Sequence, residues 1–130
     1  MTEAQEHLIL VVDDDPRVRE LVTRLLAERG LGYATAADGD EALSVVTKHP
    51  PDVVLLDLVM PNKEGIETLR ELRQLRPAMP VIAMSGTGSD NLAMASALGA
   101  TATLSKPFRK EQLLAVVESA LTLETEDEPY

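Results

Sequence analysis

Three carboxylates stand where apolar runs of the sequence end. Asp13 and Asp14 follow the run 8–12, and Asp57 follows the run 53–56. If these runs are neighbouring parallel strands, their carboxyl ends share one edge of a sheet. Carboxylates crowded there repel one another by roughly 4 kcal/mol per close pair. A hard divalent cation removes that repulsion, and an all-oxygen ligand set favours Mg²⁺ over zinc or copper, so these residues predict a magnesium site.

A hydroxyl group and an ammonium group follow two further apolar runs. Ser85 follows the run 81–84, and Lys106 comes just after the run 100–104. Beside a cation, a hydroxyl and a lysine complete a pocket for a tetrahedral anion. Each residue alone also has an ordinary interpretation: the neighbouring aspartates can simply precede a helix, Ser85 can lie in a turn, and Lys106 can be a surface lysine. Their joint occurrence at four predicted strand ends favours the site.

The elements that must position these groups alternate between strand and helix. Continuous apolar runs are typical of strands covered on both faces, and apolar residues at helical spacing separate them. Strands are expected at 8–12, 31–36, 53–56, 81–84 and 100–104, and helices at 16–29, 38–48, 66–75, 90–98 and 110–123. The apolar residues at helical spacing that mark the first and third helices are Val18, Leu21, Val22, Leu25, Leu26, Ile66, Leu69, Leu72 and Leu75.

Five strand–helix units imply an α/β protein with an open parallel sheet and helices on both faces. Right-handed crossovers leave few ways to wind such a sheet. We predict a flavodoxin-like (βα)5 three-layer sandwich with strand order 2-1-3-4-5. Ligands of such sheets bind beyond the carboxyl ends of the strands, where the carboxylates, the hydroxyl and the lysine are expected.

Composition limits the class of protein. The chain has 130 residues, which suits one domain, and 45% of them are hydrophobic. It has no cysteine, which excludes disulfides, thiolate metal sites and a thiol nucleophile. An acidic N-terminus and the lack of an apolar run near ~20 residues predict a soluble, cytoplasmic protein without a membrane span. The formal net charge of −10 argues against direct nucleic-acid binding by this chain.

Four sequence blocks surround these strand ends. They are Val11-Val12-Asp13-Asp14-Asp15-Pro16, Leu55-Leu56-Asp57-Leu58-Val59-Met60-Pro61, Val81-Ile82-Ala83-Met84-Ser85-Gly86 and Ser105-Lys106-Pro107-Phe108. The blocks resemble the motifs of the response-regulator receiver family, the CheY-like superfamily of bacterial two-component systems, and they lie in the family's order over residues 8–121. The resemblance implies a phosphorelay switch that controls a partner protein, and not an enzyme beyond assisting its own phosphotransfer and dephosphorylation.

The resemblance implies a role for each acidic residue. Asp57 would be phosphorylated by a phosphohistidine of a histidine kinase or phosphotransfer protein, because carboxylates can form such acyl phosphates. Asp14 and Asp57 would bind Mg²⁺ directly, and Asp13 would act through water. Val59 would contribute only its backbone carbonyl to the metal site.

The resemblance also assigns the groups on the last two strands. Ser85 would turn its hydroxyl toward the phosphoryl group, and Lys106 would pair with that group. Gly86 would leave room for the donor to approach. The Lys106-Pro107 peptide bond is expected to be cis, which a general rate of ~5–6% for bonds before proline would not suggest.

Three other classes of protein share parts of this pattern. A phosphatase of the haloacid dehalogenase type needs a second carboxylate two residues after its nucleophile, where this chain has Val59. A flavodoxin needs a hydroxyl-rich phosphate loop and aromatic residues around the flavin, and the aromatic residues here are only Tyr33, Phe108 and Tyr130. A pseudo-receiver that works without phosphorylation stays open, although such domains have usually lost part of the acidic set.

The switch departs from the family pattern at one position. The family's switch aromatic lies three residues before the lysine, and Thr103 stands there. The family's usual switching mechanism, in which an aromatic ring rotates inward behind the hydroxyl, therefore cannot apply literally to this chain. The signal would pass through Thr103 itself or through the segment 86–89, whose two glycines suit a mobile element.

The output surface has two interpretations of equal weight. No charged residue occurs in 91–105, and the expected helix there is rich in alanine, leucine and methionine. This is either a helix that happens to lack charges or a docking face, from Asn91 to Leu104, for an output protein or a second copy of the chain. The receiver domain is expected at 1–123, followed by an acidic, disordered tail at 124–130. A single-domain regulator is favoured over a piece of a longer protein.

Overall fold

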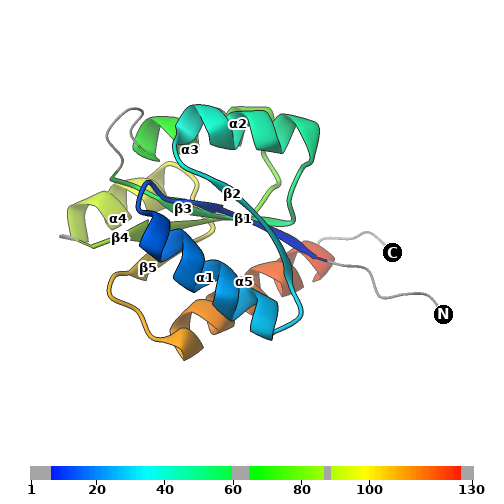
Figure 1. Ribbon diagram of the computed structural model, residues 1–130. Helices are drawn as coiled ribbons and strands as arrows, with labels where there is room; N and C mark the ends of the chain where they lie inside the picture. Colours follow the sequence, from blue (N-terminus) through cyan, green and yellow to red (C-terminus); the bar gives the residue numbers. More distant parts are fainter. Residues whose placement is uncertain (1–6, 60–64, 87–88, 127–130) are drawn as a thin grey trace.

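The computed structural model describes the backbone of residues 7–59, 65–86 and 89–126. These residues form five strands and five helices in strict alternation (Figure 1). The strands are β1 (Leu8–Val12), β2 (Gly32–Ala36), β3 (Val53–Asp57), β4 (Val81–Ser85) and β5 (Ala102–Ser105). The helices are α1 (Pro16–Glu28), α2 (Gly39–Lys48), α3 (Gly65–Leu75), α4 (Ser89–Ala97) and α5 (Lys110–Glu126).

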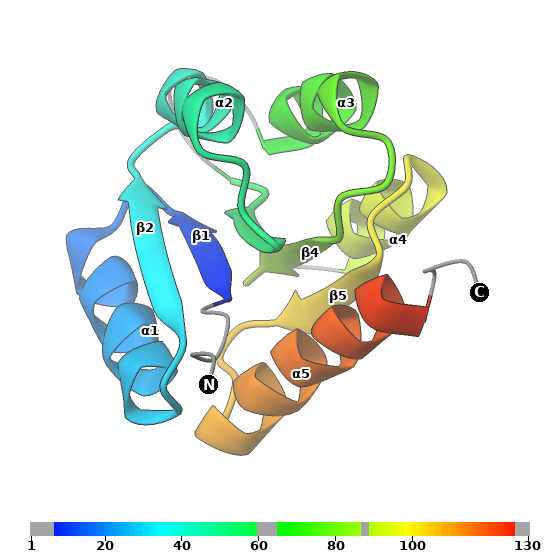
Figure 2. The same ribbon diagram turned by 90° about the vertical axis from the view of Figure 1, so that its right-hand side faces the viewer.

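All five strands are parallel, and their order is β2-β1-β3-β4-β5, which confirms the predicted topology. Helices α2 and α3 cover one face of the sheet, and α1 and α5 cover the other (Figures 1 and 2). Helix α4 belongs to the first face, because Ala95 packs into the core between that face and its helices. The predicted three-layer sandwich is therefore correct.

The central strands are buried on both faces and separate two cores. In β1, Leu10 and Val12 face the α2–α3 side, whereas Ile9 and Val11 face the α1–α5 side. All four side chains have no exposed surface. Each such side chain stabilises the fold by about 1.5–3 kcal/mol, so the sheet is a rigid base for the groups at its carboxyl edge.

Capping interactions explain the ends of α1. The Asp15 side chain accepts a hydrogen bond from the backbone N–H of Arg17, and Pro16 begins the helix. At the other end Gly30 has φ of +77°, and the N–H of Leu31 donates to the carbonyl of Leu26 at 3.0 Å. Leu31 was expected in a strand, but it belongs to this cap, and β2 begins at Gly32.

Two further boundaries differ from expectation. Strand β5 begins at Ala102. Ala100 belongs to the turn after α4, where its N–H donates to Ala95 O, and the N–H of Thr101 donates to Val81 O at the start of β4. Helix α5 continues to Glu126, beyond the expected end at residue 123. Residues 127–130 of the expected tail lie outside the described part of the chain.

Two of the apolar residues that mark the helices do not face the core. The side chains of Leu21 and Leu75 are each 46% exposed. Leu75 is the last residue of α3, beyond the reach of the core. Over residues 7–59, 65–86 and 89–126, the search for a helix long and apolar enough to cross a membrane finds none.

Candidate functional site

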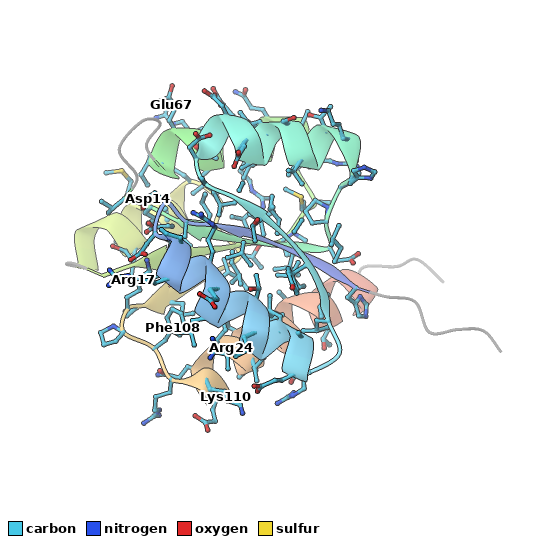
Figure 3. The ribbon with its side chains drawn as sticks, viewed as in Figure 1. Asp14, Arg17, Arg24, Glu67, Phe108 and Lys110 are labelled. Carbon is cyan, nitrogen blue, oxygen red and sulfur yellow. The ribbon has the colours of Figure 1, made fainter. Side chains whose placement is uncertain are left out.

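The three predicted carboxylates come together at the carboxyl edge of the sheet. Strands β1 and β3 pair side by side, with Val12 opposite Leu56, so the aspartates that follow them are neighbours. One oxygen from each of Asp13, Asp14 and Asp57 lies within 4.8 Å of the other two. Asp13 and Asp57 are buried and Asp14 is exposed, at the end of the sheet where α1 begins (Figure 3).

Local hydrogen bonds hold Asp13 in place. Its backbone N–H donates to Ala36 O at 3.1 Å, which continues the pairing of β1 with β2. Its carboxylate Oδ1 accepts from the N–H of Asp15 at 3.0 Å, and its own carbonyl accepts from the guanidinium of Arg19 at 2.6 Å. The turn into α1 and the helix itself therefore orient this carboxylate.

Lys106 lies between the two buried carboxylates. Its Nζ donates to Asp13 Oδ2 at 2.9 Å and lies 3.5 Å from Asp57 Oδ1. A backbone hydrogen bond from Lys106 N–H to Ser85 O, at 2.9 Å, extends the pairing of β5 with β4 and anchors the residue. Burial lowers the pKa of Lys106, but the hydrogen bond to Asp13 and the charge of Asp57 outweigh burial, so the pKa is raised.

The pKa of the Asp57 carboxyl group lies above its ordinary value. Burial, and then the negative charge of Asp13, raise its pKa from 3.8 to about 6, while Lys106 and the N–H of Val59 oppose that rise. The Val59 N–H donates to Asp57 Oδ1 at 3.3 Å. Lys106 alone therefore does not offset the unfavourable effect of burial and of Asp13 on the ionised carboxylate. A divalent cation at this place would stabilise the ionised form.

The remaining predicted residues also lie at this edge. Ser85 is 2% exposed and comes one position after Met84, which is the partner of Asp57 in the sheet. Val59 is exposed. Gly86 is exposed too, and a Cβ atom there would lie 3.6 Å from the Cβ of Lys106, an ordinary contact distance. The predicted cis bond at Lys106-Pro107 is confirmed.

The switch position and the expected docking face are only partly described. Thr103 is exposed on β5, opposite Ala83 of β4. Met94 on α4 is 50% exposed. Residues 87–88 of the glycine-rich segment lie outside the described part of the chain.

An apolar hollow beside the site was missed by the sequence interpretation. It has a volume of about 410 Å³ and lies between α1 and the turn that follows β5. Its lining residues are Val18, Leu21, Gly86, Lys106, Pro107 and Phe108. One feature of the sequence could have indicated this hollow. The apolar stripe on α1 is broader than packing against the core alone requires. Leu21, one of the apolar residues at helical spacing on α1, lines this hollow.

Known proteins are similar to this chain over most of its length. The sequence profile of the response regulator receiver domain matches residues 9–118. The response regulator MprA of Mycobacterium sp. (strain KMS) is 39% identical over 121 residues, which cover 92% of this chain and 53% of that protein. The DNA-binding transcriptional regulator NtrC of Salmonella typhimurium is 36% identical over 119 residues, covering 91% of this chain and 25% of that protein. The chain thus spans about half the length, or less, of these curated relatives.

Solved structures are similar over nearly the whole chain. A CheY-like response regulator receiver domain protein from Methanospirillum hungatei JF-1 has a TM-score of 0.91 and 28% identity, covering 95% of this chain and 100% of that one. The receiver domain of NtrX from Brucella abortus has a TM-score of 0.85 and 35% identity, and the match covers 88% of this chain and 98% of that one. The likeness therefore extends over the sheet, its helices and the edge that carries the carboxylates.

Proposed function

This chain belongs to the response regulator receiver domain family of two-component systems, and from that premise we propose that it is a phosphorylation switch whose phosphoacceptor is Asp57. One observation carries the proposal. Asp57 is a buried carboxylate beside Asp13 and Lys106, with its pKa raised to about 6. Such a strongly perturbed group among converging polar side chains is typical of a reactive site.

The proposed step is transfer of a phosphoryl group from a phosphohistidine. A carboxylate oxygen of Asp57 attacks the phosphorus, a new O–P bond forms, and the P–N bond of the donor breaks. The electron pair of that bond stays on the histidine nitrogen. Lys106, which already reaches Asp57 Oδ1, pairs with the transferred group, and the buried Ser85 hydroxyl donates to it.

We propose Mg²⁺ as the cation of the site. Asp14, Asp57 and the backbone carbonyl of Val59 would hold it, with Asp13 acting through water. The fit rests on carboxylate oxygens within 4.8 Å of one another and on the raised pKa of Asp57, which burial and then the negative charge of Asp13 cause. When bound, Mg²⁺ neutralises the carboxylates and the oxygens of the incoming phosphoryl group.

The phosphodonor would be a histidine kinase or a phosphotransfer protein. The apolar hollow gives it a place to dock, because Gly86 and Lys106 belong both to the hollow and to the edge of the site. Gly86 carries no side chain across that approach. The domain would not be an enzyme in the ordinary sense; it would assist its own phosphotransfer and dephosphorylation.

The output would be a change of conformation that a partner reads. We place the readout on the surface from Asn91 to Leu104, toward an output protein or a second copy of the chain. The net charge of −10 supports a protein partner and not nucleic acid, and the family supports a cytoplasmic location.

Phosphorylation by a small donor tests the proposal. In acetyl phosphate and Mg²⁺, intact protein mass should show the gain of one phosphoryl group by the native chain and none by Asp57→Asn, which lacks the nucleophilic charge. The control is Asp52→Asn, just before the opposite end of β3, whose oxygen still accepts the bond from Leu8 N–H. It should be labelled normally. Equal labelling of Asp57→Asn and the native chain would refute the assignment.

A further inference from the structure

Gly65, the first residue of α3, leaves no room for a side chain beside the proposed phosphoacceptor. A Cβ atom there would lie 2.3 Å from the Cα of Leu58 and 2.4 Å from the carbonyl oxygen of Asp57. Both neighbours are backbone atoms, so rotation of a side chain cannot relieve the clash. We propose that Gly65 is a positioning residue for phosphoryl acceptance, because it lets α3 lie directly on the peptide that follows Asp57. The inference rests on the proposed function and adds a residue to it.

Hydrogen bonds hold that peptide from two sides. The N–H of Leu58 donates to Met84 O of β4 at 2.9 Å, and the carbonyl of Leu58 accepts from Gly65 N–H at 3.1 Å. The Leu58 side chain is 4% exposed and packs in the core beneath α2 and α3. The residue after Asp57 is therefore clamped between the sheet and the first turn of α3.

The clamp acts on the groups that take part in the proposed chemistry. Val59, whose N–H donates to Asp57 Oδ1 at 3.3 Å and whose carbonyl is a proposed metal ligand, follows Leu58 directly. A side chain at Gly65 must push α3 outward or displace this backbone. Because displacements near 1 Å in a reacting site can cost on the order of 100-fold in rate, the displaced backbone should impair both cation binding and phosphoryl gain.

Lack of space for a side chain, and not an unusual backbone conformation, explains why position 65 is a glycine. The described glycines with positive φ are Gly30 and Gly99, so an alanine at position 65 meets no backbone strain of that kind. Gly30 is the reverse case, with φ of +77° and no atom within 4 Å of an added Cβ. Gly30→Ala therefore strains the backbone far from the site and is a matched control for loss of stability.

The test compares the native chain, Gly65→Ala and Gly30→Ala. Urea unfolding ranks their stability, intact mass gives the rate of phosphoryl gain from acetyl phosphate and Mg²⁺, and calorimetric titration gives the Mg²⁺ affinity. We expect Gly65→Ala to gain phosphoryl at least tenfold more slowly and to bind Mg²⁺ more weakly, while Gly30→Ala matches the native chain in both. A labelling rate and Mg²⁺ affinity for Gly65→Ala within twofold of Gly30→Ala would overturn the inference.

A second measurement applies if Gly65→Ala does not fold. Exchange of the Gly65 amide is followed by NMR in the native chain, with and without Mg²⁺ and beryllofluoride. At least threefold slower exchange with the ligands supports the inference, and an unchanged rate overturns it. If the native chain gains no phosphoryl group, the proposed function fails, and the Mg²⁺ affinities of the two glycine variants then decide the positioning role.

Discussion

The ammonium group of Lys106 donates to Asp13 Oδ2 at 2.9 Å, although β3 and β4 lie between the strands that these residues follow. The lysine side chain thus reaches back along the carboxyl edge of the sheet, past Asp57, which lies 3.5 Å away. It compensates part of the charge of both buried carboxylates. A phosphoryl group on Asp57 must compete with Asp13 for this ammonium group, so we expect phosphorylation to weaken the pair that spans the site.

Removal of the Lys106 charge should destabilise the metal-free protein. Lys106→Gln leaves two buried carboxylates without their cation, and we expect a loss of about 1–3 kcal/mol in unfolding free energy at pH 7. Urea unfolding in EDTA measures it. The control is Lys110→Gln, whose ammonium group is 3.4 Å from Glu28 with both side chains more than half exposed. That pair should contribute less than about 1 kcal/mol. Equal losses in the two variants would contradict this account.

Asp57 should make the metal-free protein less stable as the pH rises. Its pKa is about 6 in the folded protein against 3.8 as the ordinary value, so the folded state binds the proton more tightly. This contribution is fully present below about pH 4 and is lost as the pH rises through about 6. It amounts to at most about 3 kcal/mol.

Asp57→Asn should remove that dependence. In EDTA at pH 7 it should be more stable than the native chain, and the difference should vanish near pH 4. Urea unfolding across pH 4 to 7 checks both points. Asp52→Asn serves again as the control, and a native-like fall in the stability of Asp57→Asn between pH 4 and pH 6 would count against the assignment.

Asp14 should matter for the cation far more than for the fold. Its side chain is exposed, so Asp14→Ala should change metal-free stability by less than about 0.5 kcal/mol. Phosphoryl gain from acetyl phosphate should nevertheless fall by about tenfold or more, as it should for the native chain in EDTA. Intact mass and thermal unfolding give the two readouts. A large drop in melting temperature of metal-free Asp14→Ala would show that the carboxylate is structural.

The conformational response should concentrate near β4, α4 and β5. A phosphoryl group adds a charge of about −1.5 to −2, which draws Ser85 and Lys106 toward Asp57 and moves the backbone that follows them. Hydrogen exchange with and without beryllofluoride and Mg²⁺ should change mainly in residues 86–104, and Asp57→Asn should show no change. Changes mainly in α2 would show that the signal takes another route.

The switch should be incomplete before and after phosphorylation. Thr103 is exposed on β5 and supplies no bulky side chain that could be locked inward. Conversion of a 1:99 population into 99:1 needs ~5.5 kcal/mol of differential stabilisation, and we expect less here. Some exchange behaviour of the phosphorylated state should therefore appear in the unphosphorylated protein. A fully two-valued response, with no overlap in exchange rates over 86–104, would contradict this.

Local patterns in the sequence were enough to predict the fold and the residues that meet at the carboxyl edge of the sheet. Buried strands leave continuous apolar runs, and the rules for parallel sheets place the ends of those runs on one edge. Asp13, Asp57, Ser85 and Lys106 could therefore be assigned to one site without coordinates. The end of α1 was harder, because the bond from Leu31 to Leu26 that caps the helix depends on backbone angles that the apolar pattern does not report.

Only the tertiary structure decided how those groups meet. Lys106 and Asp13 are 93 positions apart in the sequence, and the length of their hydrogen bond depends on how β3 and β4 space the two strand ends. The exposure of Leu21 depends on how far the turn after β5 stands from α1, which helical spacing cannot tell. The lack of room for a side chain at Gly65 depends on how closely α3 packs against the backbone of Asp57 and Leu58. Periodicity records which side of an element is apolar, whereas these distances arise only when separate elements pack together.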